Sequence, residues 1–192
     1  MVRFANGTCE HVAIFRNPQA DDGGWGDLPT LPERGWAGSI DNSQLEKEAP
    51  IRVEWSAARA TYDVRGKREL GEVAKVEAVL DPWSPVVLTR TPSPIPPLRV
   101  EVPGQVQVGE VVAVTLRDEA PLPAGTIRVV RLELVGPEGN TYEVYSRNVR
   151  VESTPHREDF HLAYNDPRGP WQLKALDVAT GRGVQASFTL GA

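Results

Sequence analysis

The segment Thr91-Pro92-Ser93-Pro94-Ile95-Pro96-Pro97-Leu98 divides the chain into two parts. It contains four prolines in eight residues. Each proline fixes φ, removes a backbone donor and biases the preceding residue toward extended geometry. Such a segment does not continue a helix or a central strand, and it is typical of a semi-rigid polyproline spacer. Because strand-like sequence reaches it from both sides, we expect two modules, residues 1–90 and 99–192, joined by a Pro-rich linker at 91–98.

The composition indicates an all-β protein. A length of 192 residues fits two all-β domains of ordinary size. The chain has 17 Gly, 17 Pro and a single Met, which does not favour helices. The net charge is −5, with acidic and basic residues interspersed. Nucleic acid requires a clustered basic face, so we expect neither nucleic acid nor an anionic membrane as a partner. No apolar run approaches the ~20 residues of a membrane-spanning helix.

The cysteine content and the first residues bear on the compartment. Cys9 is the single cysteine, so neither an intrachain disulfide nor a zinc site built on cysteine pairs is expected. The run Met1–Phe4 leads directly into strand-like sequence, without the regions of a signal peptide. We therefore expect a piece of a longer bacterial polypeptide, extracellular or in the cell envelope, whose targeting signal lies upstream.

The first half reads as a β-sandwich with one long loop. Asn6-Gly7 and Arg65-Gly66 are hairpin signals between strand-like runs. Ile51–Trp55 alternates apolar and charged residues, as a half-buried strand does. Residues 17–48 have no clear period, and loops of this length are usually functional or disordered. The expected strands are Val2–Phe4, Cys9–Arg16, Ile51–Trp55, Thr61–Val64, Lys67–Leu70, Val76–Leu80 and Pro85–Leu88.

The second half alternates more regularly. It shows about seven short apolar–polar runs separated by turn residues, which is typical of an immunoglobulin-like Greek key. Strict alternation places one face toward a core and one toward water, and so predicts antiparallel pairing. The runs begin near Leu98, Val112, Val130, Tyr142, Phe160, Trp171 and Val184.

Stretches in both halves resemble known modules. Asn165–Ala175, followed by Asp177 and Thr180-Gly181, resembles the penultimate hairpin of bacterial immunoglobulin-like and macroglobulin-like domains, with its Asp-Pro-x-Gly-x-Trp signature. His11–Arg16 and Tyr62–Gly71 resemble the C-terminal β-sandwiches of bacterial β-galactosidase-like polypeptides. The resemblance implies an accessory role without chemistry, because the catalytic acid and nucleophile of such hydrolases sit in a barrel that this chain does not contain.

The long loop holds the best candidate ligand contacts. Trp25 and Trp36 lie in glycine-rich sequence beside Asp22, Asp27 and Arg34. Sugar rings pack on exposed aromatic rings while neighbouring polar groups reach the hydroxyls, so these five residues are a candidate carbohydrate site. Two alternatives remain open. The rings could instead cover the edge of the core, since tryptophan is usually buried, or they could belong to a protein interface.

Other constellations do not favour chemistry. Asp21, Asp22 and Asp27 do not have the spacing of a calcium-binding EF-hand loop, so a solvated acidic loop is the better interpretation. No Gly-x-Ser-x-Gly nucleophile elbow occurs, and no metal or cofactor is expected.

The three remaining tryptophans are interpreted as packing residues. Trp55, Trp83 and Trp171 lie on or beside expected strands, and Trp171 begins an apolar alternation that predicts a place in the sandwich core.

The sequence therefore predicts a non-catalytic accessory module of a larger, glycoside-hydrolase-like protein, which acts in spacing, docking or weak carbohydrate binding. Its expected partners are the rest of the parent polypeptide, another protein, or carbohydrate. The alternative is a structural or adhesive protein–protein interaction module of a cell-surface protein. A third class, an autonomous enzyme, would need a pair of carboxylates in a cleft between the modules.

Overall fold

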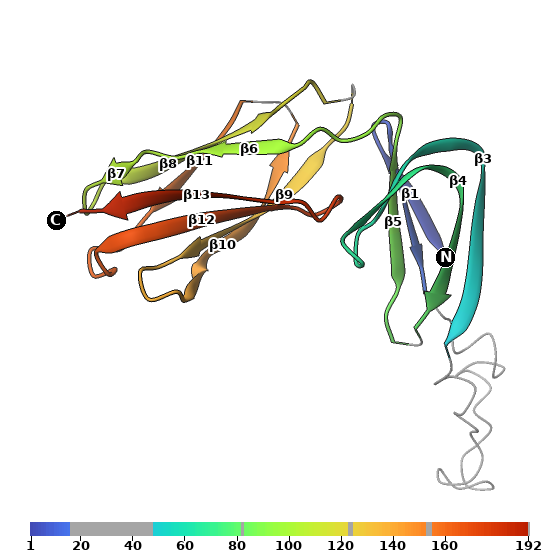
Figure 1. The fold of residues 1–192 in the computed structure, drawn as a ribbon, viewed down its shortest axis with the longest axis horizontal. Helices are drawn as coiled ribbons and strands as arrows, with labels where there is room; N and C mark the ends of the chain where they lie inside the picture. Colours follow the sequence, from blue (N-terminus) through green and yellow to red (C-terminus); the bar gives the residue numbers. More distant parts are fainter. Residues whose placement is uncertain (16–47, 82, 123–124, 153–154, 192) are drawn as a thin grey trace, which may run out of the picture.

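A computed structural model describes residues 1–15, 48–81, 83–122, 125–152 and 155–191. Within these ranges the chain forms thirteen strands and no helix, arranged in three sheets (Figure 1). This confirms the all-β fold class with antiparallel sheets in β-sandwich architecture. Strands β1 to β5 make up what we call the first module, and strands β6 to β13 make up the second module.

The first module is built from one continuous antiparallel sheet in the order β1-β2-β5-β3-β4. The strands are β1 (Val2–Asn6), β2 (Cys9–Ile14), β3 (Ala49–Asp63), β4 (Arg68–Leu80) and β5 (Val86–Thr91). β3 curves strongly (Figure 1), and its first half pairs only with β4 while its second half also pairs with β5. The bend lets a single sheet enclose a small core, in which Val12 and Leu88 lie opposite each other and are 1% exposed.

Both hairpins expected in the first module are present. Asn6 pairs with Cys9 across the β1–β2 turn, where Gly7 has a φ of 60°. In the β3–β4 turn the residue with positive φ is Lys67 rather than Gly66. The strands predicted from the sequence were shorter than β3 and β4, because bulges within these strands interrupt the apolar alternation.

The second module is a sandwich of a five-stranded sheet, β10-β9-β12-β13-β7, and a three-stranded sheet, β11-β8-β6. Its strands are β6 (Leu98–Glu101), β7 (Gln105–Val106), β8 (Val111–Asp118), β9 (Arg128–Val135), β10 (Thr141–Val151), β11 (His156–His161), β12 (Gly169–Asp177) and β13 (Gly183–Leu190). This distribution of strands between two sheets is that of an immunoglobulin-like Greek key. The core lies between the sheets, and Trp171 at its centre is 1% exposed, as predicted.

One element of the second module was missed. The two-residue strand β7 pairs in parallel with β13, so the pairing is not antiparallel throughout. A strand this short carries no alternation that a sequence pattern could reveal.

The proline-rich segment bridges the two modules directly. Thr91 is the last residue of β5 and Leu98 the first of β6, which leaves residues 92–97 between them. The strands of the second module run across the view in Figure 1, whereas those of the first run up and down. The proposed division of the chain at 91–98 remains a prediction.

Candidate functional site

A buried arginine organises the inside of the first module. Arg90 lies opposite Glu10 on neighbouring strands and is 2% exposed. Its Nη1 is 3.0 Å from Oε2 of Glu10, and its Nη2 donates to the carbonyl oxygen of Ala57 at 2.6 Å. The guanidinium group also stacks on the ring of Trp55, 4.1 Å from its centroid. Because a buried charge is costly unless it is paired, these contacts are what permits an arginine in this small core.

A bulge in β3 creates two of the features around this arginine. The register jumps from the Glu54–Lys75 pair to the Arg59–Val73 pair, so residues 55–58 of β3 face only Ala74 of β4. Bulges disrupt the ladder and re-aim side chains. The Ala57 carbonyl is therefore available to Arg90, and Arg59 follows directly after the bulge.

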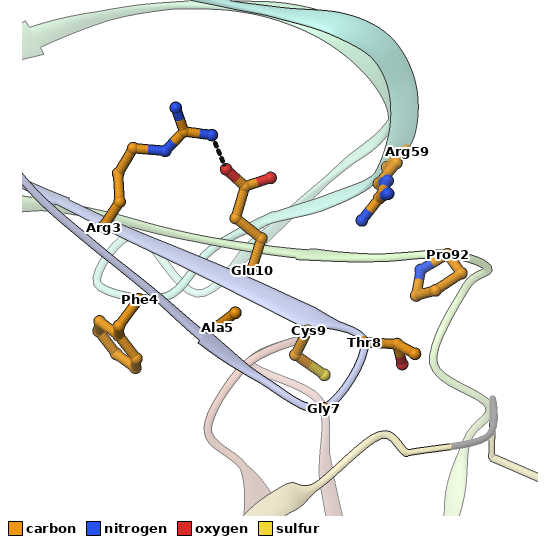
Figure 2. Close-up of a pocket in the computed structure, with 9 residues that line it drawn as sticks. All are labelled: Arg3, Phe4, Ala5, Gly7, Thr8, Cys9, Glu10, Arg59 and Pro92. Atoms are coloured by element: carbon orange, nitrogen blue, oxygen red, sulfur yellow. Dashed lines mark hydrogen bonds and ion pairs between the residues drawn. The ribbon is translucent and has the colours of Figure 1, made fainter.

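Arg59, Arg3 and Glu10 line a hollow of about 580 Å³ on the surface of the first module. Figure 2 shows Arg3 and Glu10 rising from the same side of the β1–β2 hairpin, with Arg59 facing them from β3. Phe4 points to the opposite side of the hairpin. Thr8 and Pro92 border the hollow at its other end. We refer to this feature as the arginine hollow.

The charges in the arginine hollow do not balance. Glu10 forms ion pairs with both Arg3 and Arg90. Among the residues that the structure describes, no carboxylate pairs with Arg59. Arg3, Arg59 and Glu10 line the hollow, and Arg90 pairs with Glu10 from its buried position without lining it. Together these are three guanidinium groups and one carboxylate, an excess of two formal positive charges.

The pKa directions are consistent with this arrangement. Burial lowers the pKa of Arg90; Glu10 raises it, and the guanidinium groups of Arg59 and Arg3 lower it further. Burial raises the pKa of Glu10, but hydrogen bonds and charges from Arg3 and Arg90 outweigh burial and leave that pKa below its ordinary value. Glu10 is therefore ionised at neutral pH and compensates one of the three cations.

A second notable region is the junction between the modules, where the linker is held by side chains and backbone from both sides. The N–H of Ile95 donates to the hydroxyl of Tyr62 at 2.7 Å. The carbonyl of Ile95 accepts from Arg182 at 3.2 Å, and that of Pro97 accepts from the N–H of Glu119 at 3.0 Å. Ile95 itself is 3% exposed and packs with apolar residues of both modules: Ala60, Tyr62, Leu122 and Ala179.

Two glycines permit close contact between turns across this junction. Gly7 of the β1–β2 turn lies against Gly125, and a Cβ at Gly7 would meet the carbonyl oxygen of Gly125 at 2.0 Å. Gly181 of the β12–β13 turn lies against Lys67, whose backbone oxygen would be 2.6 Å from a Cβ there. Both glycines also have positive φ, so a side chain at either position would be strained as well as obstructed.

A buried ion cluster lies directly beneath the linker in the second module. Arg128 contacts Asp118 and lies 2.7 Å from Asp177, and all three side chains are at most 2% exposed. Arg128 also donates to the carbonyl oxygen of Pro96. The cluster joins the ends of β8 and β12 and the start of β9 to the linker, and it fixes the linker against the second module.

The five residues predicted to contact a ligand, Trp25, Trp36, Asp22, Asp27 and Arg34, lie outside the described residues, so they stay a prediction.

The interpretation of Trp83 as a packing residue was wrong. Its side chain is 80% exposed. Trp83 lies in the connection between β4 and β5, where its N–H donates to the carboxylate of Asp81 at 2.7 Å. This Asx turn fixes the local backbone, and it leaves the ring outside the core. Trp55, in contrast, is half-buried against Arg90.

Sequence reasoning missed the arginine hollow and the buried ion cluster, because it treated interspersed charges as surface. One signal was available for the hollow. Glu10 alternates with Val12, and Arg90 alternates with Leu88, so both charged residues occupy positions on the apolar face of a strand. A cross-strand pair of opposite charge on an inward face is an indication of a buried ion pair.

The described ranges contain neither a candidate metal site nor a candidate membrane-spanning helix. No group of three or more His, Cys, Asp or Glu side chains there could hold a metal ion. No described helix is long and apolar enough to cross a membrane.

Comparison with known proteins gives weak similarities to glycoside hydrolases. No protein-family model and no curated protein matches the sequence. A β-glucosidase from Listeria innocua matches 50% of this chain over 16% of its own length, with 11% identity and a TM-score of 0.32. A β-glucuronidase from Bacteroides uniformis matches 96% of this chain over 26% of its own length, with 10% identity and a TM-score of 0.27. The chain thus spans about a quarter or less of the enzymes to which it is weakly similar.

Proposed function

We propose that this chain is a non-catalytic accessory module of a larger bacterial extracellular protein of the glycoside-hydrolase-like kind. Its role is to hold neighbouring parts of that protein at a fixed spacing and orientation, with weak carbohydrate binding in addition. The observation that carries the proposal is the junction, where the linker bonds to both modules instead of running free between them.

The chemistry of the linker explains why these bonds give rigidity. Prolines restrict φ and supply no donors, so the linker has few internal ways to satisfy its carbonyl groups. Arg182 completes the connection from the second module, because it bonds both to Ile95 and to Glu69 of the first module. Small interfaces between domains ordinarily allow relative motion, so the number of specific contacts at this junction supports the proposed role in fixing an orientation.

We expect the double variant Tyr62→Phe, Arg182→Ala to loosen the junction while both modules stay folded. Each change removes a hydrogen bond to Ile95, worth about 1 kcal/mol for the Tyr62 bond. Small-angle X-ray scattering should then show a larger maximum dimension, and relaxation measurements by NMR should show the two modules tumbling separately.

The matched control is Tyr145→Phe combined with Arg157→Ala. Tyr145 accepts a hydrogen bond from Ala163, and Arg157 pairs with Asp159, so both lie within the second module. If the control and the junction variant scatter identically, the spacing role is contradicted.

Carbohydrate binding is expected to depend on Trp25 and Trp36. Replacing both by alanine should abolish retention on a polysaccharide that the native chain binds, because stacking against a sugar ring needs the aromatic face. Affinity electrophoresis across a panel of plant and bacterial polysaccharides measures this, with Trp83→Ala as the control for loss of a tryptophan elsewhere. A native chain that no polysaccharide retards would contradict this part of the proposal.

A second candidate function, a protein–protein interaction module, is favoured by one observation. β1 is an edge strand of its sheet, and its Val2 and Phe4 side chains are 50% and 56% exposed. An edge strand with exposed apolar side chains is suited to pairing with another chain.

A further inference from the structure

The arginine hollow combines features that belong to a binding site rather than to a surface ion pair. Arg90 is almost completely buried, and its Nε has no hydrogen-bond partner in the structure. Arg59 faces Glu10 across the hollow in Figure 2, yet that carboxylate is already held by Arg3 and Arg90. Within the described ranges, three like charges thus share one counter-charge, an arrangement that costs energy unless an anion completes it.

The chemistry of the cations indicates which anion fits. A guanidinium group is planar and presents parallel N–H donors that match the two oxygens of a carboxylate. Arg59 is exposed and unpaired among the described residues, so its donors are available without breaking an existing contact. The side chain of Arg3 is 56% exposed. It contributes a second positive charge from the opposite side of the hollow.

The size and surroundings of the hollow favour a sugar over a peptide side chain. Its volume of about 580 Å³ lies in the range of small-molecule sites and exceeds what one acidic side chain fills. The ring of Pro92 and the methyl group of Ala5 offer apolar contact at the border of the same hollow.

We propose that the arginine hollow binds the carboxylate of a uronic-acid unit in an acidic saccharide, with Arg59 as its principal ligand and Arg3 on the opposite side of the hollow. Glu10 is the positioning residue, because its ion pairs fix Arg3 and hold the buried Arg90 in place. This inference rests on the proposed carbohydrate binding and names the class of saccharide that is bound.

The test is a titration of the ¹⁵N-labelled chain, followed by NMR, with trigalacturonate and with the neutral galactose trisaccharide. We expect saturable shifts at residues of the β1–β2 hairpin and around Arg59 with the acidic sugar alone. The variant Arg59→Ala should weaken that binding about tenfold or more, since a hydrogen bond to a charged group is involved. Arg59→Lys should recover part of the affinity, because it keeps the charge but loses the planar fork.

The variants should stay folded, since Arg59 is exposed and makes no ion pair with a described residue. Arg157→Ala, an exposed arginine of the second module, is the matched control and should bind trigalacturonate like the native chain.

Each other outcome overturns the assignment in a distinguishable way. Equal binding of both sugars, unaffected by Arg59→Ala, overturns the uronate site but leaves carbohydrate binding intact. Binding of a glutamate-rich peptide that depends on Arg59, with no saccharide bound, makes the occupant a protein and also overturns the proposed carbohydrate binding. Absence of any binding at millimolar ligand overturns the uronate site, and carbohydrate binding is overturned with it when the polysaccharide panel also shows no retardation.

Discussion

Replacing Trp171 by alanine is expected to lower the free energy of unfolding by about 3–5 kcal/mol, the range for large aromatic residues removed from a core. Trp171 is 1% exposed and packs against Tyr142, with ring centroids 4.8 Å apart, and against Phe188 at 6.3 Å. Its indole N–H also donates to the carbonyl oxygen of Pro167 at 2.9 Å, so the substitution orphans an acceptor as well as leaving a cavity. Denaturant titration followed by circular dichroism measures the loss.

The control for this variant is Trp83→Ala. The side chain of Trp83 is 80% exposed, so the same chemical change there should alter stability by no more than about 0.5 kcal/mol. Similar losses in both variants would show that Trp171 is not the centre of the sandwich core.

The second large effect is expected from Arg128→Met. This change keeps the volume of the side chain but leaves the carboxylates of Asp118 and Asp177 buried without their cation. Breaking a buried pair in this way costs about 3–5 kcal/mol, because the remaining charge has lost its partner and cannot regain water. The loss is again measured by denaturant titration at neutral pH.

Arg150→Met provides the matched comparison. Arg150 pairs with Glu152, and both side chains are more than 60% exposed, so this ion pair should contribute about 0–1 kcal/mol. A loss of stability in Arg128→Met no larger than that in Arg150→Met would contradict the electrostatic explanation.

Much of the second module could be predicted from the sequence, because its strands are marked by short-range patterns of apolar, polar and turn residues. Several strands there, such as β9, alternate between the core and water: Leu132 and Leu134 are buried and are flanked by Arg131 and Glu133. Turn residues separate the strands. The buried position of Trp171 followed from the same alternation.

The first module was harder to predict, for two physical reasons. The bulge before Arg59 interrupts the period of β3, so one bent strand looks like two short ones. The core also includes Arg90. A charged residue is assigned to the surface by sequence patterns unless its ion-pair partner on another strand is known. Pairing between Glu10 and Arg90 spans 80 positions, which no local pattern can reveal.

The contacts of Ile95 determine which portion of this chain can be fused to another protein. Cutting between β5 and β6 would uncover Tyr62 and Ala60 on one fragment and Ala179 on the other, all of which now pack around one isoleucine. Each fragment would therefore expose apolar side chains to water at the cut. The two modules together are therefore the smallest unit suited to grafting onto another protein, and a fusion that preserves Gly7 and Gly181 would keep their relative geometry.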